Sequence, residues 1–571
     1  MLNAKLIGCL SLLALSSVLA EPVIANASFE EDTALLQNVK SEEITKNPKA
    51  LALVEGKWCR LAWGCPNATD TACSFVEMKN APAGKRVAQI DAKINQISCF
   101  AYTLTGLTPG QWYEVSAMLR CEKTVGQGTF IQVEYWSKGY ASGTIDSEHL
   151  VGSVPWTRAV VQFQAPGKEY NQILSCWQFG GPGKSWLDDV KIRKIAPPAN
   201  DISKRRVLDA PFWGMFTCFA NYLHQYGKDM KAAGVYWQRQ GCSALAPENQ
   251  KVAADLGMAY EMCLDGMPAA TDPKDPCYPV TNSKEYRAYV ENCLKQAGPT
   301  IKIWEVFNEP NTRPDWTLPG YANLLCLAGK TIKAAKPDAI FATGGFTSPE
   351  IGYTEACLRR GADKYLDLVL CHPYGVDEAL DSRLVAFTAA FQRRHRPDLM
   401  LAINETGFPT WDPATDWPPN DWFVSEHDQA SKVVKLHIQA LAHKLSFVTY
   451  LGWNDFPKVS DQARNMGLVR MDGSPKPSYY AYRFMTKTIG NRKVANWTYQ
   501  PDTGARVYTF TGAKPVWVVW NALNDTDVVV DTGATEVFLC DAMGTKLTVK
   551  PASGKITVKA TIDPVYLVPI E

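Results

Sequence analysis

The chain has 571 residues, of which 46% are hydrophobic, and its formal net charge is +1. This length exceeds what one hydrophobic core organises, so we expect about three or four domains. The charge balance gives no basic excess for binding nucleic acid, and no stretch after the N-terminus approaches the ~18 apolar residues of a membrane span, so we predict neither kind of partner.

The first twenty residues have the pattern of a signal peptide. Lys5 precedes an apolar stretch over 6–19, and Ala20 precedes Glu21. We therefore predict cleavage after residue 20 and an exported protein, either periplasmic or extracellular. A lipoprotein modified at Cys9 is the alternative, but it leaves only a short apolar segment before that cysteine.

Residues 21–195 are predicted to form a β-sandwich. Short segments of alternating apolar and polar residues, such as Trp112–Leu119 and Phe130–Trp136, are separated by glycine and proline turns. This alternation is typical of strands that bury one face. The segment 196–206 is polar and contains two prolines, and we interpret it as a linker to a domain beginning near Val207.

Residues 207–489 contain apolar runs that alternate with amphipathic helices, for example a helix over about 429–443. Eight runs alternating with helices indicate a (β/α)8 TIM barrel, whose active site forms at the carboxyl ends of the strands. The runs are Phe212–Phe216, Gly234–Arg239, Met258–Met262, Ile301–Glu309, Ala339–Gly344, Leu366–His372, Leu399–Glu405 and Phe447–Trp453. Strand-like segments return over 490–571, so the predicted fold class is multidomain, with the barrel flanked by the N-terminal sandwich and a small, structural C-terminal β-sandwich.

Two glutamates lie at the ends of these runs. Glu309 ends the fourth run and Glu405 ends the seventh. Cleavage of a glycosidic bond needs one carboxyl group to protonate the leaving oxygen and a second to attack or stabilise the sugar centre. The pair therefore predicts a glycoside hydrolase with Glu309 and Glu405 as catalytic residues, although either one alone is equally consistent with a salt-bridged loop residue.

The barrel segment resembles the glycoside hydrolases of clan A, closest in look to the family 39 and family 5 types. The motifs are Asn308-Glu309-Pro310 and the stretch Glu405–Pro409. The resemblance implies that Glu309 is the general acid/base, that Glu405 is the nucleophile, and that Asn308 contacts the sugar 2-hydroxyl. It also implies a retaining reaction, for which the carboxyl groups lie about 5 Å apart.

Three further strand ends resemble the same clan. Arg239 closes the second run, where the clan's arginine keeps the nucleophile ionised. His372 and Tyr374 follow the sixth run and resemble a motif that contacts substrate and orients the nucleophile. Trp453 ends the eighth run, where it would be an aromatic sugar platform, with a buried rim tryptophan as the alternative. Glu305 is interpreted as a polar residue of the barrel interior.

The N-terminal sandwich resembles carbohydrate-binding modules of the jelly-roll type, on the motifs Asn26–Glu30 and Trp186–Ile192. Related modules hold a structural calcium ion, which would make Glu30 and Asp189 candidate ligands; ordinary exposed acids are the alternative. Possible sugar-stacking residues, which are equally consistent with a sandwich core, are Trp58, Trp63, Trp112 and Trp136.

The cysteine and histidine spacings predict no catalytic metal, and we expect no cofactor. There are 7 histidines, and none forms a His-x-x-x-His pattern. The group Cys59, Cys65 and Cys73 could hold one disulfide. Small buried residues are the better interpretation of the cysteines within apolar patterns, namely Cys263, Cys293, Cys326 and Cys371.

The predicted function is therefore a secreted retaining glycosidase that acts on a β-linked poly- or oligosaccharide. One alternative is a transglycosylase with the same residues, and another is a non-catalytic carbohydrate-binding protein with a degenerate barrel. The sugar remains open, because the segment Glu405–Pro409 resembles β-1,3-glucanases whereas the other strand ends resemble the xylosidase and iduronidase family. The sequence does not predict whether cleavage is internal or terminal, and it does not predict the oligomeric state.

Overall fold

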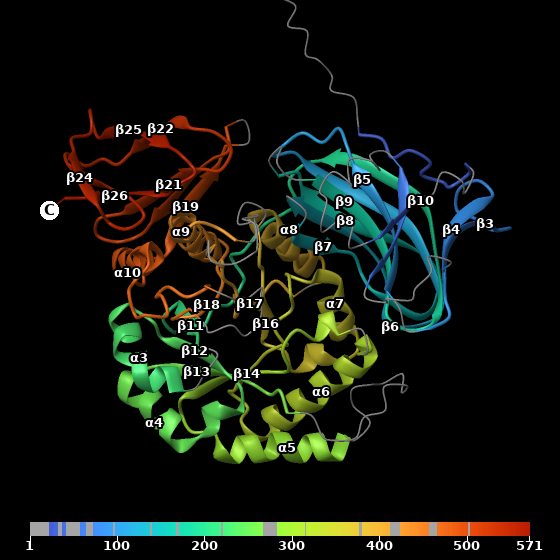
Figure 1. Ribbon diagram of the computed structural model, residues 1–571, viewed down its shortest axis with the longest axis horizontal. Coiled ribbons are helices and arrows are strands. Elements are labelled where there is room, and N and C mark those ends of the chain that lie inside the picture. Colours follow the sequence, from blue (N-terminus) through green and yellow to red (C-terminus); the bar gives the residue numbers. More distant parts are fainter. Residues whose placement is uncertain are drawn as a thin grey trace, which may run out of the picture.

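The computed structural model describes residues 22–31, 37–40, 57–63, 72–94, 97–137, 140–166, 171–217, 221–266, 283–313, 316–375, 380–394, 396–411, 423–455, 465–500 and 503–570. Three groups of elements follow one another along these residues. A β-rich N-terminal part and a smaller β-rich C-terminal part lie on either side of a central α/β part (Figure 1). The predicted signal peptide and Cys65 lie outside the described residues.

The central part is an eight-stranded parallel sheet in the order β15-β14-β13-β12-β11-β18-β17-β16. Two parallel bridges, Ala342 to Leu368 and Phe346 to Cys371, join its outer strands and close the sheet into a barrel. Every predicted run overlaps one of its strands, and β12 and β13 each extend one residue past their runs. The strands are β11 (Trp213–Phe216), β12 (Trp237–Gln240), β13 (Ala259–Cys263), β14 (Ile301–Glu305), β15 (Ile340–Phe341), β16 (Leu368–Cys371), β17 (Met400–Ile403) and β18 (Val448–Leu451).

The helices that follow these strands cover the barrel from outside (Figure 1). Their buried faces carry apolar residues at helical spacing, as Tyr286, Val290, Cys293 and Leu294 do on α5. The helices are α3 (Asn221–Ala232), α4 (Pro247–Leu256), α5 (Ser283–Gln296), α6 (Leu318–Ala335), α7 (Ile351–Arg359), α8 (Leu380–Arg393), α9 (Glu426–Ala442) and α10 (Pro477–Ile489). The helix predicted over 429–443 is α9.

The N-terminal strands form a largely antiparallel sheet that folds over on itself. The long strand β6 carries the bend, because its first half pairs with β10 and β8 whereas its second half pairs with β9 and β7. Aromatic residues such as Phe29, Trp58 and Phe75 pack in the core. The strands are β1 (Gln37–Lys40), β2 (Trp58–Trp63), β3 (Cys73–Glu77), β4 (Arg86–Ala92), β5 (Ile97–Leu104), β6 (Trp112–Ser137), β7 (Tyr140–Asp146), β8 (Leu150–Gln164), β9 (Asn171–Phe179) and β10 (Gly183–Ile195).

The C-terminal part has a six-stranded sheet and a two-stranded sheet, β22-β25, with a separate apolar core between them. It contacts the barrel through Asp381 of α8, which accepts hydrogen bonds from Nε of Arg506 over 2.9 Å and from the hydroxyl of Tyr508 over 3.3 Å. Its strands are β19 (Val494–Tyr499), β20 (Ala505–Phe510), β21 (Val516–Asn521), β22 (Thr526–Asp531), β23 (Val537–Cys540), β24 (Lys546–Val549), β25 (Lys555–Ala560) and β26 (Val565–Pro569).

The segment 196–206 has neither helix nor strand, but it is not a free tether. Arg205 is buried, and its guanidinium donates to the carbonyl oxygen of His443 over 2.6 Å and to the hydroxyl of Thr388 over 2.7 Å. A buried guanidinium is costly unless its donors are satisfied. The segment is therefore fixed against the barrel.

The cysteine predictions have a mixed outcome. Cys59 has a free thiol, so it takes no part in the disulfide suggested for its group, whereas Cys65 lies outside the described residues and leaves the rest of that prediction open. Cys263, Cys293 and Cys371 are buried, as predicted, whereas Cys326 is partly exposed.

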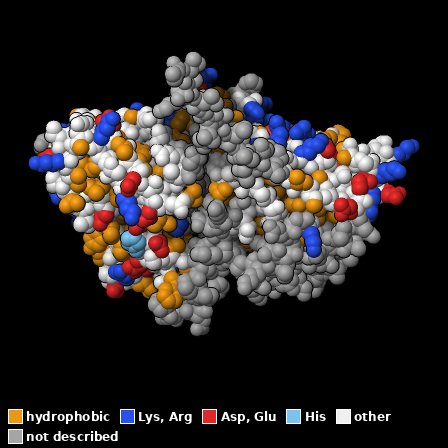
Figure 2. Space-filling model, turned by 90° about the horizontal axis from the view of Figure 1, so that it is seen from above, with side chains coloured by type: hydrophobic (Ala, Val, Ile, Leu, Met, Phe, Trp, Pro, Cys, Tyr) orange, Lys and Arg blue, Asp and Glu red, His pale blue; other side chains and the backbone are white. Residues whose placement is uncertain are grey.

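Charged side chains of both signs occur on the described surface. On the described part of the face in Figure 2, acidic and basic side chains occur together on both sides of the molecule. Among the described helices, none combines the length and the apolar character needed to cross a bilayer.

Candidate active site

The two predicted glutamates come together at the carboxyl end of the barrel. Glu405 follows β17 by two residues, and Glu309 follows β14 by four. A carboxyl oxygen of each, together with a ring nitrogen of His372, lie within 4.8 Å of one another. The side chain of Glu309 is 25% exposed and that of Glu405 is 14% exposed, so both remain within reach of a small molecule.

The backbone that presents Glu309 is unusual. Phe307 has φ 64° and Glu309 has φ 46°, which is the left-handed region that bulky residues avoid. Each such residue costs about 1–3 kcal/mol, so surrounding contacts must hold it. The amide of Glu309 donates to the carbonyl of Gly345 over 3.0 Å, and a parallel bridge joins Asn308 to the same glycine.

Arg239 of β12 organises the site. Its Nη1 donates to Oε2 of Glu405 over 2.5 Å, and its Nη2 donates to Oδ1 of Asn308 over 2.7 Å. The Nε and Nη2 atoms also form a two-pronged bond to Glu305, with both distances at 2.8 Å. Arg239 and Glu305 are buried, which makes these charge-assisted bonds strong and their geometry fixed.

The electrostatics distinguish Glu405 from an ordinary buried acid. Burial alone would raise the pKa of Glu405, but the charges of His372 and Arg239 and the hydrogen bonds from Tyr374 and Arg239 hold it below its usual range. Burial would likewise lower the pKa of Arg239, yet the charges of Glu305 and Glu405 raise it well above its usual range. Glu405 is therefore held as a carboxylate beside a permanent cation.

His372 and Tyr374, after β16, each contact one of the two glutamates. Nδ1 of His372 lies 2.9 Å from Oε1 of Glu309, and the hydroxyl of Tyr374 donates to Oε1 of Glu405 over 2.7 Å. A Cβ atom on Gly345 would lie 1.9 Å from Nε2 of His372, so only glycine leaves space for the imidazole. The six residues Arg239, Asn308, Glu309, His372, Tyr374 and Glu405 thus form one connected group.

The sequence reasoning missed two members of the polar interior below this group. Asn404 donates from Nδ2 to Oε1 of Glu261 over 2.8 Å, whereas the other carboxyl oxygen of Glu261 is buried without a donor. Burial and the charge of Glu305 raise the pKa of Glu261 well above its usual range, which favours the neutral form of this carboxyl group. A charged residue inside the apolar run Met258–Met262 was the available signal.

The surroundings of Trp453, Glu30 and Asp189 give less support to the roles predicted for these residues. Trp453 follows β18 but is only 2% exposed and packs edge-on against Tyr479, which agrees with a buried rim tryptophan. Glu30 accepts hydrogen bonds from the amides of Lys85 and Arg86, each over 2.8 Å. Asp189 pairs with Lys191 over 2.7 Å.

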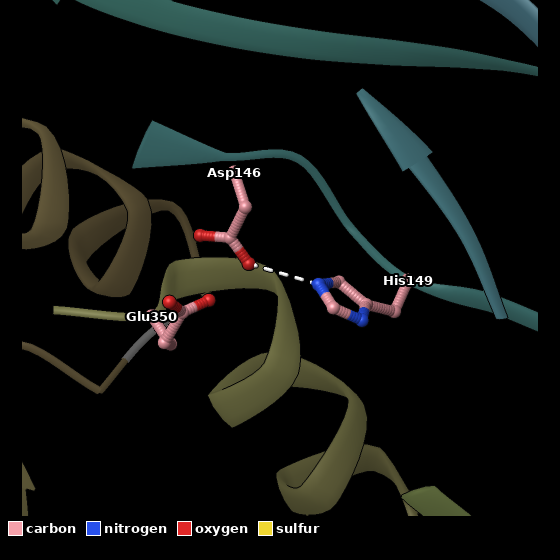
Figure 3. A group of neighbouring side chains, drawn as sticks. All are labelled: Asp146, His149 and Glu350. Atoms are coloured by element: carbon pink, nitrogen blue, oxygen red, sulfur yellow. Dashed lines mark hydrogen bonds and ion pairs between the residues drawn. The ribbon is translucent and has the colours of Figure 1, made fainter. Parts of the chain in front are cut away.

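Two groups of the described residues have a spacing that could hold a metal ion. One is Glu309, His372 and Glu405, and the other is Asp146, His149 and Glu350 (Figure 3). In the first group the Arg239 cation is already bonded to Glu405, which opposes a second cation. Neither group contains Glu30 or Asp189.

Comparison with solved structures identifies the fold. A family 39 glycoside hydrolase from the gut symbiont Bacteroides cellulosilyticus WH2 has a TM-score of 0.52 and 18% identity, covering 79% of this chain and 96% of that one. The fold is that of a family 39 glycoside hydrolase. The resemblance of the barrel to this family, expected from its motifs, is confirmed at the level of fold.

Two further family 39 structures match less of the chain. A β-xylosidase from Caulobacter crescentus has a TM-score of 0.44 and 15% identity, over 66% of this chain and 98% of that one. An enzyme from Xanthomonas axonopodis pv. citri has a TM-score of 0.43 and 16% identity, over 66% of this chain and 96% of that one. No protein-family model matches the sequence, and no curated protein matches it.

Proposed function

We propose that the protein is a retaining glycoside hydrolase that cleaves β-glycosidic bonds with Glu405 as nucleophile and Glu309 as general acid/base. The observation that carries the proposal is the spacing of the two glutamates, because one carboxyl oxygen of each lies within 4.8 Å of the other. Retaining enzymes place their two carboxyl groups about 5–5.5 Å apart, whereas inverting enzymes need a wider gap for a water molecule. The family 39 fold supports the same assignment.

The different partners of the two carboxyl groups support their different roles. Glu405 has a lowered pKa and accepts bonds from Arg239 and Tyr374, as an ionised nucleophile should. Glu309 has no cationic arginine partner among the described contacts and faces His372 instead. We therefore assign the proton-transfer role to Glu309, the carboxyl group that Arg239 does not bind.

The proposed reaction has two displacements. Glu309 gives its proton to the glycosidic oxygen while the carboxylate of Glu405 bonds to the anomeric carbon and the leaving group departs. Glu309, now ionised, then takes a proton from water, and the water oxygen displaces Glu405 from the same carbon. Oδ1 of Asn308 is occupied by Arg239, so its Nδ2 is the group left to donate to the sugar 2-hydroxyl.

Secretion, the substrate and a glycan-binding role of the N-terminal sandwich also belong to the proposal. We propose a β-linked poly- or oligosaccharide outside the cytoplasm as the substrate. A transglycosylase would use the same two glutamates and would pass the sugar to an acceptor instead of water. Product analysis in the presence of an acceptor sugar separates these two activities.

The test is hydrolysis by the mature protein of a panel of β-linked polysaccharides and aryl β-glycosides, measured as release of reducing sugar or aglycone. The variants Glu405→Gln and Glu309→Gln remove each carboxyl group with little change in shape. The matched control is Glu248→Gln, an exposed glutamate of α4. We expect both site variants to lose at least about 10³-fold in activity while the control keeps wild-type activity. A wild type inactive on the whole panel, with glycan binding retained, would instead support the non-catalytic alternative.

A further inference from the structure

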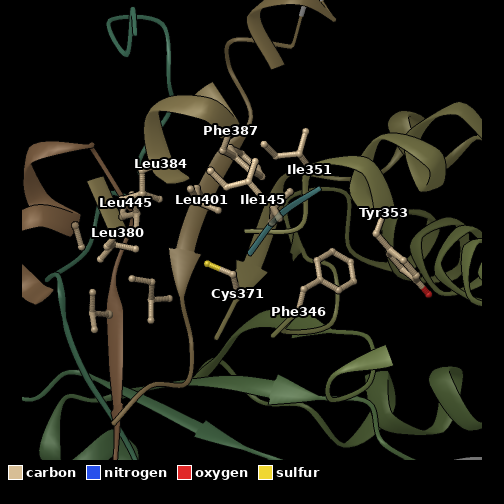
Figure 4. Packing of buried hydrophobic residues seen from close by; sticks show 14 of the residues in the cluster. Ile145, Phe346, Ile351, Tyr353, Cys371, Leu380, Leu384, Phe387, Leu401 and Leu445 are labelled. Atoms are coloured by element: carbon tan, nitrogen blue, oxygen red, sulfur yellow. The ribbon is translucent and has the colours of Figure 1, made fainter. Parts of the chain in front are cut away.

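The N-terminal sandwich is docked on the barrel by a dense contact. Ile145 of β7 is 2% exposed and lies among barrel side chains between Ile351 and Phe387 (Figure 4). The hydroxyl of Ser348 donates to the carbonyl of Thr144 over 3.1 Å in the same contact. The two parts therefore meet as a packed interface with a shared apolar core.

Asp146 of the sandwich caps a helix of the barrel. Its Oδ1 accepts from the amide of Ile351 over 2.8 Å, and its Oδ2 accepts from the amides of Gly352 and Tyr353 over 2.9 and 3.3 Å. Residue Glu350, which precedes α7, makes no capping bond with its own side chain. A carboxylate at a helix N-terminus satisfies unpaired amides and interacts favourably with the helix dipole, so Asp146 performs the cap that Glu350 does not.

His149 extends this contact toward the barrel mouth. Its Nε2 lies 3.0 Å from Oδ2 of Asp146 (Figure 3). Its Nδ1 lies 3.1 Å from the carbonyl oxygen of Gln127, and the ring stacks on Phe130. A metal ion between Asp146, His149 and Glu350 is disfavoured, because the α7 amides already fill the lone pairs of Asp146 and the helix N-terminus repels cations. The group is therefore a hydrogen-bonded clasp between the two parts.

Gln127, at the other end of the clasp, reaches the loop that carries Glu309. Its Nε2 donates to the carbonyl oxygen of Asn311 over 2.5 Å, and it is only 3% exposed. It lies between Gly126 and Gly128, which have φ of 69° and 84° and where an added Cβ would lie within 2.6 Å of neighbouring backbone oxygens. The backbone that holds Gln127 is thus fixed on both sides.

Asn311 is itself tied to the strand end that supports Glu309. Its Nδ2 donates to the hydroxyl of Thr347 over 2.9 Å, and the amide of Thr347 donates back to its Oδ1 over 3.3 Å. Gly345, two residues before Thr347, accepts from the amide of Glu309. The left-handed backbone at Glu309 is therefore held from one side by the β15 end and from the other by the sandwich.

We propose that Gln127 is a positioning residue for Glu309, so that the N-terminal sandwich forms part of the catalytic machinery. This inference rests on the proposed function of Glu309. Loss of the bond to Asn311 frees a strained loop, and displacement of a catalytic group by about 1 Å costs about 100-fold in rate. The loss of rate falls on kcat, because the hydrogen bond between Gln127 and Asn311 is not a contact with the substrate.

The experiment compares Gln127→Met with Gln162→Met in the full-length protein. Both changes keep an unbranched side chain of similar length, and Gln162 also contacts the barrel, through Arg393, but on an exposed part of the interface. Hydrogen exchange of the segment 309–313 is measured by mass spectrometry, together with kcat, KM and Tm. If Gln127→Met does not fold, Gln127→Ala replaces it, because a water molecule can enter the smaller site.

The expected result for Gln127→Met is faster exchange in 309–313 and a fall in kcat of about 10- to 100-fold, with KM changed less than about threefold. Gln162→Met should leave the exchange of 309–313, kcat and KM unchanged. Unchanged exchange, or faster exchange without a fall in kcat, overturns the inference. If the wild type hydrolyses nothing, the proposed function fails, and exchange alone then decides whether Gln127 anchors the loop.

Discussion

Arg239 and Glu405 are joined across the mouth of the barrel. Arg239 belongs to β12 and Glu405 follows β17, and two strands, β11 and β18, separate them in the sheet order. The 2.5 Å bond between Nη1 and Oε2 therefore spans the barrel interior and does not connect adjacent strands. Because Arg239 also holds Glu305 and Asn308, one guanidinium fixes the relative positions of the strand ends that carry both catalytic candidates.

The replacement Tyr374→Phe should change the pH dependence of kcat/KM. The Tyr374 hydroxyl stabilises the ionised form of Glu405 and lowers its pKa, so its removal raises that pKa. The acid limb of the pH profile should move to higher pH by up to about one unit, and kcat/KM at neutral pH should fall about tenfold. The control is Tyr480→Phe, at an exposed residue of α10. An unchanged acid limb in Tyr374→Phe would show that Glu405 is not the group that titrates there.

Glu305→Gln and Glu261→Gln should have opposite outcomes although the two residues are both fully buried. Glu305 balances the charge of Arg239, so its neutralisation should lower Tm and reduce kcat/KM by at least about 100-fold. The pKa of Glu261 is raised well above its usual range, which favours its neutral form, so glutamine there should keep kcat/KM within about tenfold. Thermal melts give Tm and steady-state kinetics give kcat/KM for both variants. Equal losses of Tm and kcat/KM in the two variants would mean that Glu261 carries a charge.

The sequence predicted the barrel well because its signals are local. Each of the eight apolar runs is long enough to mark a strand, and the position of Glu309 and Glu405 after two of them follows from the rule that barrel sites form at carboxyl strand ends. The contacts of Arg239 with Glu305 and Asn308 could not be predicted, because spacing along the chain does not give distances across a barrel. The sequence also left open whether Trp453 is a sugar platform or a buried rim residue, since its burial depends on the neighbouring Tyr479.

The contact between the sandwich and the barrel had no sequence signal at all. Gln127 and Asn311 are 184 residues apart, and each is an ordinary polar residue in its own segment. The segment 196–206 has the composition of a linker, yet Arg205 fixes it to His443 and Thr388. Composition indicates where a chain can be flexible, and only the packed structure shows where it is held.

Asp381→Asn should destabilise the protein in a pH-dependent way. Burial would raise the pKa of Asp381, but the hydrogen bond with His443 and the charge of Arg506 hold it below its usual range. A carboxyl group with a lowered pKa contributes stability above its unfolded pKa of about 3.9, and that stability is lost as pH falls through the folded value. Thermal melts should therefore show a Tm lower by several degrees at pH 7, with the difference from wild type shrinking below about pH 4.

A constant Tm difference between pH 3 and pH 7 would contradict this account of Asp381. Asp398→Asn is the matched control, because the side chain of Asp398 is 44% exposed and its ion pair is worth little. We expect that control to melt within about two degrees of the wild type at every pH.

The most direct test of the central claim is to trap the proposed glycosyl-enzyme. The wild type and Glu405→Gln are incubated with a set of 2-deoxy-2-fluoro β-glycosides that carry good leaving groups, and the labelled residue is located by peptide mass spectrometry. A retaining mechanism with Glu405 as nucleophile predicts one sugar bonded to the peptide containing Glu405 in the wild type and none in the variant. A sugar bonded to any other residue, or hydrolysis of the parent glycosides that yields the inverted anomer, would contradict it.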